Sequence, residues 1–78
     1  MSVTVLYFAA LREVAGVSEE LLDLPESLPA LYAALRERHE FTHGQGQLRV
    51  ACNGVFCDWK RIPADGDVIA FIPPVSGG

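Results

Sequence analysis

The sequence is poor in several features that would point to a particular class of function. It has two cysteines, six basic residues against ten acidic ones, and a net charge of −4. Without a basic stripe to neutralise phosphates, nucleic-acid binding is not expected. No apolar run approaches the ~20 residues of a membrane-spanning helix, and two thiols are too few for a [2Fe–2S] cluster, which takes four thiolates. A chain of 78 residues has only a small core, so its size favours a binding module or an accessory subunit.

The first residues and the thiols together predict the compartment. Met1 is followed at once by an alternating strand pattern, without the charged segment and longer apolar run of a signal peptide. We therefore expect a cytoplasmic protein with reduced thiols and no Cys52–Cys57 bridge. Neither His39 and His43 nor the two cysteines are expected to hold a metal, because Cys52 lies in an apolar segment, where a free cysteine behaves as a buried hydrophobe.

What the sequence does contain is enough for one small folded domain of 78 residues, half of them hydrophobic. Alternation, β-rich composition and turn signals predict strands over 2–8, 17–24, 48–52, 55–59 and 67–72, the fourth of them short and distorted. Residues 9–16 look like a short helical turn closed by Gly16, and 40–47 read as a loop. Asn53-Gly54 and Asp65-Gly66 are the turn signals.

One longer helix is predicted over residues 28–38. Ser27 is a suitable N-cap with Pro29 in the first turn, and the apolar residues follow the i, i+3, i+4, i+7 spacing at Leu28, Leu31, Tyr32 and Leu35. A single apolar stripe must pack against a sheet, so the fold class is α+β, a roll with the first and last strands side by side at the centre. The expected core contains Val5, Leu31, Leu35, Val50, Ile69 and Phe71.

The first and last strands carry apolar residues on both faces. Val3, Val5 and Tyr7 would face the helix, with Ile69 and Phe71. This alternation leaves a second apolar face that the single helix cannot cover, made of Leu6, Phe8, Val68 and Ile72. Such a face is expected to bind a partner, or to be covered or self-associate. We expect Trp59 to be a packing residue and Lys60 and Arg61 to form a solvated hairpin tip.

Two separated segments resemble one family. Phe8–Gly16, read as FAALREVAG, is similar to the F-A-x-x-R-E-x-x-G segment of molybdopterin synthase small subunits. Asp65–Gly78 resembles their C-terminal D-G-D-x-V-A-F-x-P-P-V-x-G-G, and Ala51-x-Asn53 also fits. The resemblance runs through the whole chain in order and is weakest around residues 39–47.

This resemblance implies a ubiquitin-like β-grasp fold, with a mixed sheet of four to five strands over residues 1–74 and a flexible tail over 75–78. It also implies a sulfur carrier that binds no cofactor. An adenylyltransferase related to ubiquitin-activating enzymes would use ATP to adenylate Gly78, and a persulfide donor would then convert the adenylate to a thiocarboxylate. In the family, the small subunit docks on a large subunit in a heterotetramer and donates this sulfur to a cyclic pyranopterin precursor of molybdopterin.

The resemblance also assigns roles to residues. Gly78 would carry the thiocarboxylate and Gly77 would precede it; neither has a Cβ, so both can pass a narrow channel. Phe8, Phe56 and Ile72 match positions that contact the large subunit, and Val68 stands where the family often has an acid. The remaining expected partner contacts are the residues that lead to the end, Pro73, Pro74, Val75 and Ser76. No side chain of this chain needs to act as an acid or base.

Other functions remain open from the sequence. The same terminal chemistry serves sulfur carriers for thiamine or for tRNA thiolation, although thiamine carriers are usually shorter and lack the Phe-Ala…Arg-Glu segment. An acyl adenylate can also lead to an isopeptide bond with lysine, as in a ubiquitin-like protein modifier. A plain binding domain would make no use of Gly77-Gly78.

Overall fold

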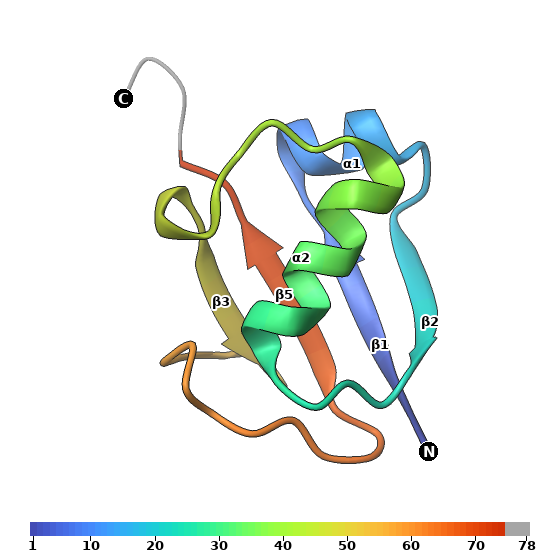
Figure 1. The fold of residues 1–78 in the computed structure, drawn as a ribbon, viewed down its shortest axis with the longest axis vertical. Helices are drawn as coiled ribbons and strands as arrows, with labels where there is room; N and C mark the ends of the chain where they lie inside the picture. The colour runs from blue at the N-terminus through green and yellow to red at the C-terminus, as the bar shows by residue number, and fades with distance from the viewer. Residues whose placement is uncertain (75–78) are drawn as a thin grey trace.

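The computed structural model describes residues 1–74, which form a mixed sheet, two helices and one 3₁₀ turn. The strands are β1 (Ser2–Tyr7), β2 (Glu19–Asp23), β3 (Arg49–Cys52), β4 (Val55–Cys57) and β5 (Val68–Ile72). The helices are α1 (Ala9–Ala15) and α2 (Leu28–His39), and the 3₁₀ turn η1 is Gln45–Gln47. Figure 1 shows α2 lying across the sheet, with α1 at one end of it.

The sheet has the strand order β2-β1-β5-β3-β4. The first and last strands pair in parallel at its centre, with Val5 opposite Ile69 and Tyr7 opposite Phe71, and the outer pairs are antiparallel. The predicted central pairing of the two end strands is therefore confirmed, and the fold is a ubiquitin-like β-grasp of the α+β class. The predicted tail over residues 75–78 lies outside the described residues.

Helix α2 follows the sequence pattern at both ends. The Ser27 hydroxyl accepts a hydrogen bond from the backbone amide of Ala30 at 3.1 Å, which caps the helix as predicted. At the other end Glu40 adopts a left-handed conformation, with φ of 59°, and its amide bonds to the carbonyl of Arg36. The helix runs one residue further than predicted, to His39.

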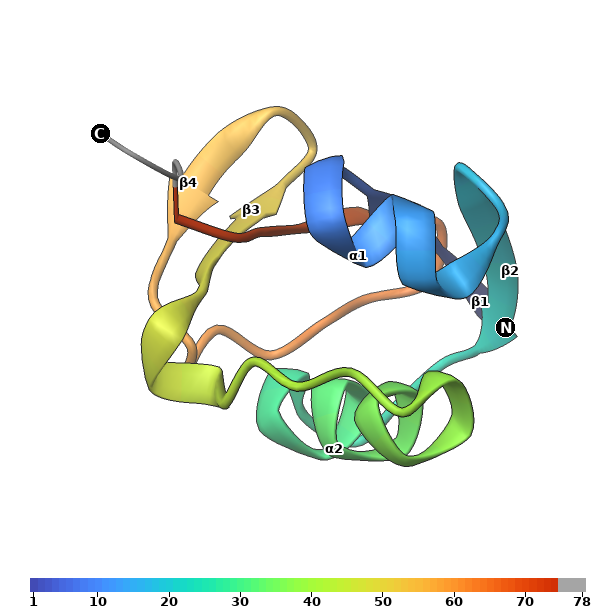
Figure 2. The same ribbon diagram turned by 90° about the horizontal axis from the view of Figure 1, so that it is seen from above.

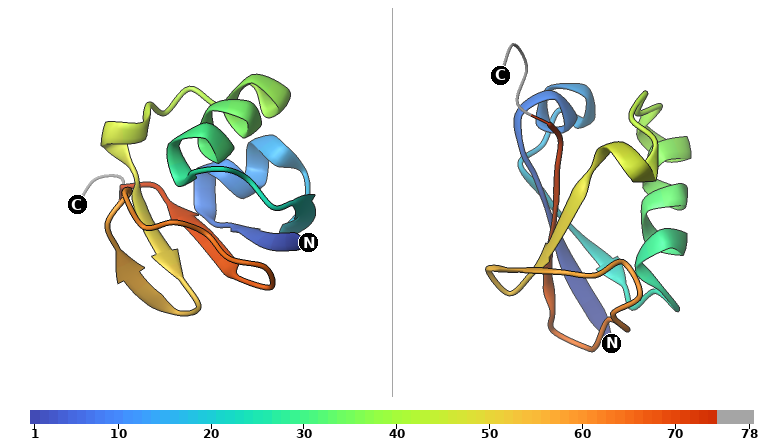
Figure 3. Two further views of the ribbon diagram at one scale, coloured as in Figure 1. Left: turned by 60° about the horizontal axis from the view of Figure 1, so that its bottom comes forward. Right: turned by 90° about the vertical axis from the view of Figure 1, so that its left-hand side faces the viewer.

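The core lies between α2 and one face of the sheet, as the views in Figure 2 and Figure 3 show. Every predicted core residue is buried, with no more than 6% of its surface exposed: Val5, Leu31, Leu35, Val50, Ile69 and Phe71. The Phe71 ring stacks with Trp59 at a centroid distance of 5.6 Å and packs at a tilt against Tyr32 at 5.2 Å, so Trp59 is the packing residue that the sequence suggested. Leu11 of α1 closes the core at the end of the sheet.

All five strands are shorter than predicted, and for the first and the last the reason is local. The first strand ends at Tyr7, because the carbonyl of Phe8 already accepts the first hydrogen bonds of α1, from the amides of Leu11 and Arg12. The last strand begins at Val68, because Asp67 bonds to the preceding turn through its amide. Within the described residues, neither helix has the length and apolar character needed to cross a membrane.

Candidate functional site

The end of β5 is the place to which the sequence motifs point. Strands β1 and β5 run in parallel, so both finish at the same end of the sheet, where α1 lies (Figure 1). The pairing of Tyr7 with Phe71 brings the next residues, Phe8 and Ile72, to neighbouring positions. A groove there is lined by Phe8, Ala9, Ala10, Glu13, His43, Ile72, Pro73 and Pro74. The two motifs that resemble one family are therefore adjacent in space at this end.

The sheet face away from α2 carries a continuous apolar surface. Strand register places Leu6 beside Ala70, Ala70 beside Ala51, and Ala51 beside Phe56, in one row across the sheet. The large side chains of this surface remain open to solvent: Phe8 is 44% exposed and Phe56 is 54% exposed. We call Leu6, Phe8, Phe56, Val68 and Ile72 the outer apolar face. The predicted contact residues Phe8, Phe56, Val68 and Ile72 thus share one surface.

One basic residue on this surface was missed in the sequence. Arg49 of β3 lies opposite Ile72 of β5, and its guanidinium carbon lies 4.1 Å from the centre of the Phe56 ring. Such a cation–π contact restrains both side chains. Arg49 lies two positions before Ala51, so strand alternation could have placed it on the outer face.

The two prolines after β5 differ in exposure. Pro73 is buried and Pro74 is exposed, although both had been predicted to contact a partner. A second groove, lined by residues that include Arg49 and Phe56, lies on the other side of Ile72, Pro73 and Pro74. The predicted site residues Val75, Ser76, Gly77 and Gly78 lie outside the described residues.

Asp67 anchors the chain at the start of β5. Its carboxylate accepts hydrogen bonds from Asn53 Nδ2 at 2.9 Å, from the Ala64 amide at 2.8 Å and from Arg61 Nη1 at 3.0 Å. The bonds from Asn53 and Ala64 lower the pKa of Asp67 despite its burial, with Arg61 adding to the effect. Arg61 is exposed, as predicted, but the sequence did not reveal that its guanidinium pairs with Asp67.

A second polar cluster joins β1, β2 and α2. Glu20 Oε1 accepts a hydrogen bond from the Tyr7 hydroxyl at 2.5 Å and contacts His39 Nε2 at 2.6 Å, while Arg38 lies 3.6 Å from Glu20 Oε2. Burial would raise the pKa of Glu20, but the hydrogen bonds from Tyr7 and His39 and the nearby positive charges outweigh it, so this pKa is lowered. Burial, together with the bond to Glu20, raises the pKa of Tyr7. The cluster fixes the end of α2 to the sheet.

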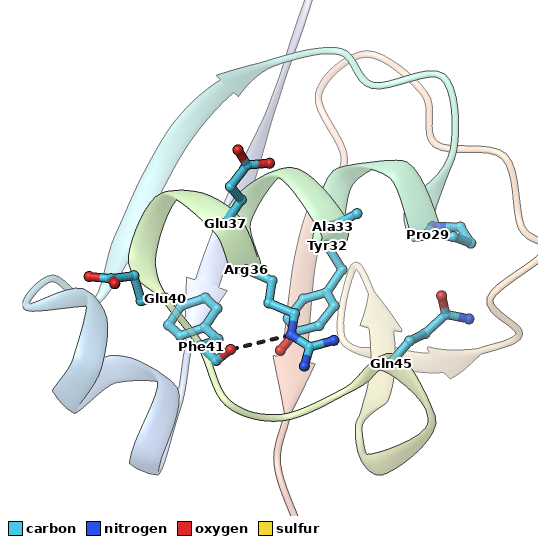
Figure 4. A pocket seen from close by; sticks show the side chains of 8 residues that line it. All are labelled: Pro29, Tyr32, Ala33, Arg36, Glu37, Glu40, Phe41 and Gln45. Atoms are coloured by element: carbon cyan, nitrogen blue, oxygen red, sulfur yellow. Dashed lines mark hydrogen bonds between the residues drawn. The ribbon is translucent and has the colours of Figure 1, made fainter.

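A further hollow lies on α2 (Figure 4), lined by Pro29, Tyr32, Ala33, Arg36, Glu37, Glu40, Phe41 and Gln45. Arg36 is already engaged there, because its Nε donates to the carbonyl of Phe41 at 3.3 Å. Among residues 1–74, no three or more His, Cys, Asp and Glu side chains gather closely enough to hold a metal ion. The chemical features of the described chain therefore point to the outer apolar face and the end of β5.

The fold and this surface define a ubiquitin-like β-grasp domain whose last strand ends beside an exposed apolar face. The chain belongs to the ThiS family, whose sequence profile matches residues 5–78. That match includes Gly77-Gly78 as well as most of the folded domain.

Curated relatives extend over nearly the whole chain. It is 36% identical to the molybdopterin synthase sulfur carrier subunit of Escherichia coli, with 97% of this chain and 99% of that protein covered. It is 37% identical to the protein of the same name from Chlamydomonas reinhardtii, with both chains covered completely.

Solved structures give the same fold. The putative molybdopterin converting factor subunit 1 of Pyrococcus furiosus has a TM-score of 0.79 and 37% identity, covering 96% of this chain and 99% of that one. One chain of the Helicobacter pylori complex of subunits 1 and 2 of molybdopterin-converting factor has a TM-score of 0.72 and 30% identity, with both chains covered completely. The small archaeal modifier protein 1 of Methanosarcina acetivorans has a TM-score of 0.81 and 28% identity, covering 99% and 96%.

Proposed function

We propose that this protein is the sulfur carrier subunit of a molybdopterin synthase, acting in the cytoplasm. The observation that carries the proposal is the family match through residue 78, together with two relatives of that name whose full lengths align with this chain. Sulfur would be held as a thiocarboxylate on Gly78 and donated to a cyclic pyranopterin precursor. The protein would bind no cofactor of its own.

The chemistry requires activation of an unreactive group. A carboxylate is a poor electrophile, so a ubiquitin-activating-like adenylyltransferase would join the Gly78 carboxylate to AMP from ATP, releasing pyrophosphate. The terminal sulfur of a persulfide donor would then attack the acyl carbon and displace AMP. A reductant, such as a thiol, would cleave the resulting acyl disulfide and leave the thiocarboxylate on Gly78. The anionic sulfur is a strong nucleophile, so the acid–base groups can reside on the partner proteins.

The outer apolar face supports a protein partner in this scheme. Phe8, Phe56 and Val68 are each at least 36% exposed on one side of a domain of 78 residues. An exposed apolar patch of this kind is typical of an interaction surface. A relative with 30% identity has been solved as a complex of subunits 1 and 2 of molybdopterin-converting factor. We propose the synthase large subunit as the partner that covers this face.

The test is conversion of the terminus by purified components. The protein is incubated with ATP, its cognate adenylyltransferase and a persulfide donor with a thiol reductant, and its intact mass is then measured. We expect sulfur to replace one oxygen, and fragmentation to place it on the peptide that ends at Gly78. Adding one alanine after Gly78 moves the carboxylate by ~3.3 Å. A displacement of ~1 Å can already cost about a hundredfold in rate, so the extended protein should not be thiolated.

Deletion of Gly78 should likewise abolish thiolation, and the thermal unfolding of both variants should equal that of wild type. Equal thiolation of the extended protein would contradict the proposal. Sulfur mapped to Cys52 or Cys57, with none on the terminal peptide, would contradict it as well.

A protein modifier is the second candidate, because the Methanosarcina acetivorans small archaeal modifier protein 1 has the same fold at 28% identity. In that case the Gly78 adenylate would pass to a lysine amine and form an isopeptide bond. The two functions are separated by tagging the chain at Met1 in cells of its source organism. A ladder of lysine conjugates favours the modifier, whereas co-purification of a pterin-binding large subunit favours the sulfur carrier.

A further inference from the structure

Two thiols meet on the β3–β4 hairpin. The register pairs Cys52 with Val55 and Val50 with Cys57, so Cys52 and Cys57 occupy diagonal positions on the same face of adjacent strands. Both are free thiols, and the Sγ of Cys57 donates a hydrogen bond to the Sγ of Cys52 at 3.3 Å. A disulfide bond of ~2.0 Å requires the two sulfur atoms to approach by only ~1.3 Å more.

The two thiols differ in their access to solvent. Cys52 lies in the core with 5% of its surface exposed, whereas Cys57 is half-buried. Cys57 also lines a hollow together with Asp58, Trp59 and Phe56. A small reagent can therefore approach Cys57, while Cys52 is shielded behind it.

We propose that Cys52 and Cys57 form a thiol-modification site that closes to an intramolecular disulfide when a low-molecular-weight disulfide such as oxidised glutathione is present. The Cys57 thiolate attacks one sulfur of the reagent, forms a mixed disulfide and releases one glutathione thiolate. The Cys52 thiolate then attacks Cys57 Sγ and releases the second. The two protein thiols are oxidised by two electrons, one glutathione disulfide is reduced, and the two protons pass to solvent or to the released thiolates.

The environment of the pair sets the conditions for this reaction. Burial is the main cause that raises the pKa of Cys57 to about 11, and the hydrogen bond and the electrostatic interaction with Cys52 add to it. Because the thiolate is the attacking species, the rate should rise ~10-fold for each unit by which the pH is increased, as long as the pH stays below that value. Cys57 therefore rests as a thiol at neutral pH, and its reaction is favoured by alkali.

The disulfide would act on the hairpin that carries Phe56, one residue of the outer apolar face. Phe56 immediately precedes Cys57 and lies opposite Ala51, which precedes Cys52. A bond between Cys52 and Cys57 would cross this pair diagonally and tie β4 to β3. The site is therefore placed to restrain Phe56 in its contact with Arg49.

The test treats the folded full-length protein with oxidised glutathione at pH 7, 8 and 9 and measures intact mass over time. Wild type should lose two hydrogens and retain no glutathione, faster at each higher pH. Cys52→Ala should keep one glutathione on Cys57, because no second thiol is present to displace it. Cys57→Ala should react at least ~10-fold more slowly than Cys52→Ala while folded, and at a similar rate in urea, where Cys52 is no longer shielded.

Stable glutathione adducts on wild type, or disulfide-linked dimers, would overturn the proposal. So would equal rates for folded Cys57→Ala and Cys52→Ala, since the order of attack depends on the shielding of Cys52. Circular dichroism of each variant establishes that these rates refer to folded protein. Cys57→Ala should fold, because it changes a side chain at the margin of the core.

Discussion

Replacing Asp67 by alanine should lower the free energy of unfolding by about 3 kcal/mol. Asp67 is 7% exposed as a residue, and its carboxylate accepts bonds from Asn53 Nδ2 and from the Ala64 amide, at 2.9 and 2.8 Å. A hydrogen bond to a charged group contributes ~1.5–3 kcal/mol. Two such bonds give ~3 kcal/mol at the low end, the value suited to a site close to the surface. We leave the bond from the exposed Arg61 out of this sum.

The measurement is urea and thermal unfolding followed by circular dichroism. For a domain of this size, a loss of ~3 kcal/mol corresponds to a fall of ~12–24 °C in the melting temperature. Asp23→Ala is the control, because Asp23 is an exposed acid on β2, and it should change stability by no more than ~0.5 kcal/mol.

A double-mutant cycle isolates the contact between Asp67 and Asn53. Asn53→Gly is the suitable partner, since Asn53 has a φ of 53° and glycine adopts this conformation without strain. We expect a coupling energy of about 1 kcal/mol or more, as found for residues in one hydrogen-bond network. A loss below about 1 kcal/mol for Asp67→Ala, or a coupling energy near zero, would refute this account of how β5 is anchored.

Two more predictions concern the docking surface and acid stability. Phe8→Asp should weaken binding to the large subunit at least ~100-fold in calorimetry, because an unpaired desolvated charge costs several kcal/mol. The variant should still fold, because Phe8 is the N-cap of α1 and aspartate is a favoured N-cap residue. The control is Ile62→Asp, at a 71% exposed position in the loop at the other end of the molecule, which should bind as wild type does. Because the pKa of Glu20 is lowered from 4.5, the unfolded state binds protons first, so stability conferred by this group is present above pH 4.5 and is lost as pH falls through the lowered pKa. Unfolding in urea between pH 3 and 7 should show that Glu20→Gln flattens this dependence, and an unchanged pH profile would contradict the role of the cluster.

Elements with a local signal could be predicted from the sequence alone. Helix α2 was predicted within one residue of its observed end, because its cap at Ser27 and its apolar spacing are properties of consecutive residues. The inward residues of β1 follow from strict alternation, and left-handed glycines occur after both Asn53 and Asp65, as those turn signals require. The outer apolar face could also be predicted, since Phe8, Val68 and Ile72 are apolar residues that a single helix cannot cover.

Contacts between distant residues were decided by the tertiary structure. Asp67 meets Asn53 across 14 residues, and Glu20 meets His39 across 19, so neither pair has a pattern that a local reading can detect. The diagonal approach of Cys52 and Cys57 depends on how β3 and β4 pair. The position of Arg49 over the Phe56 ring depends on the same strand pairing. Local sequence determines which residues favour a helix, a strand or a turn. The polar partner of each residue depends on which strands become neighbours, and burial of the whole apolar surface selects that arrangement.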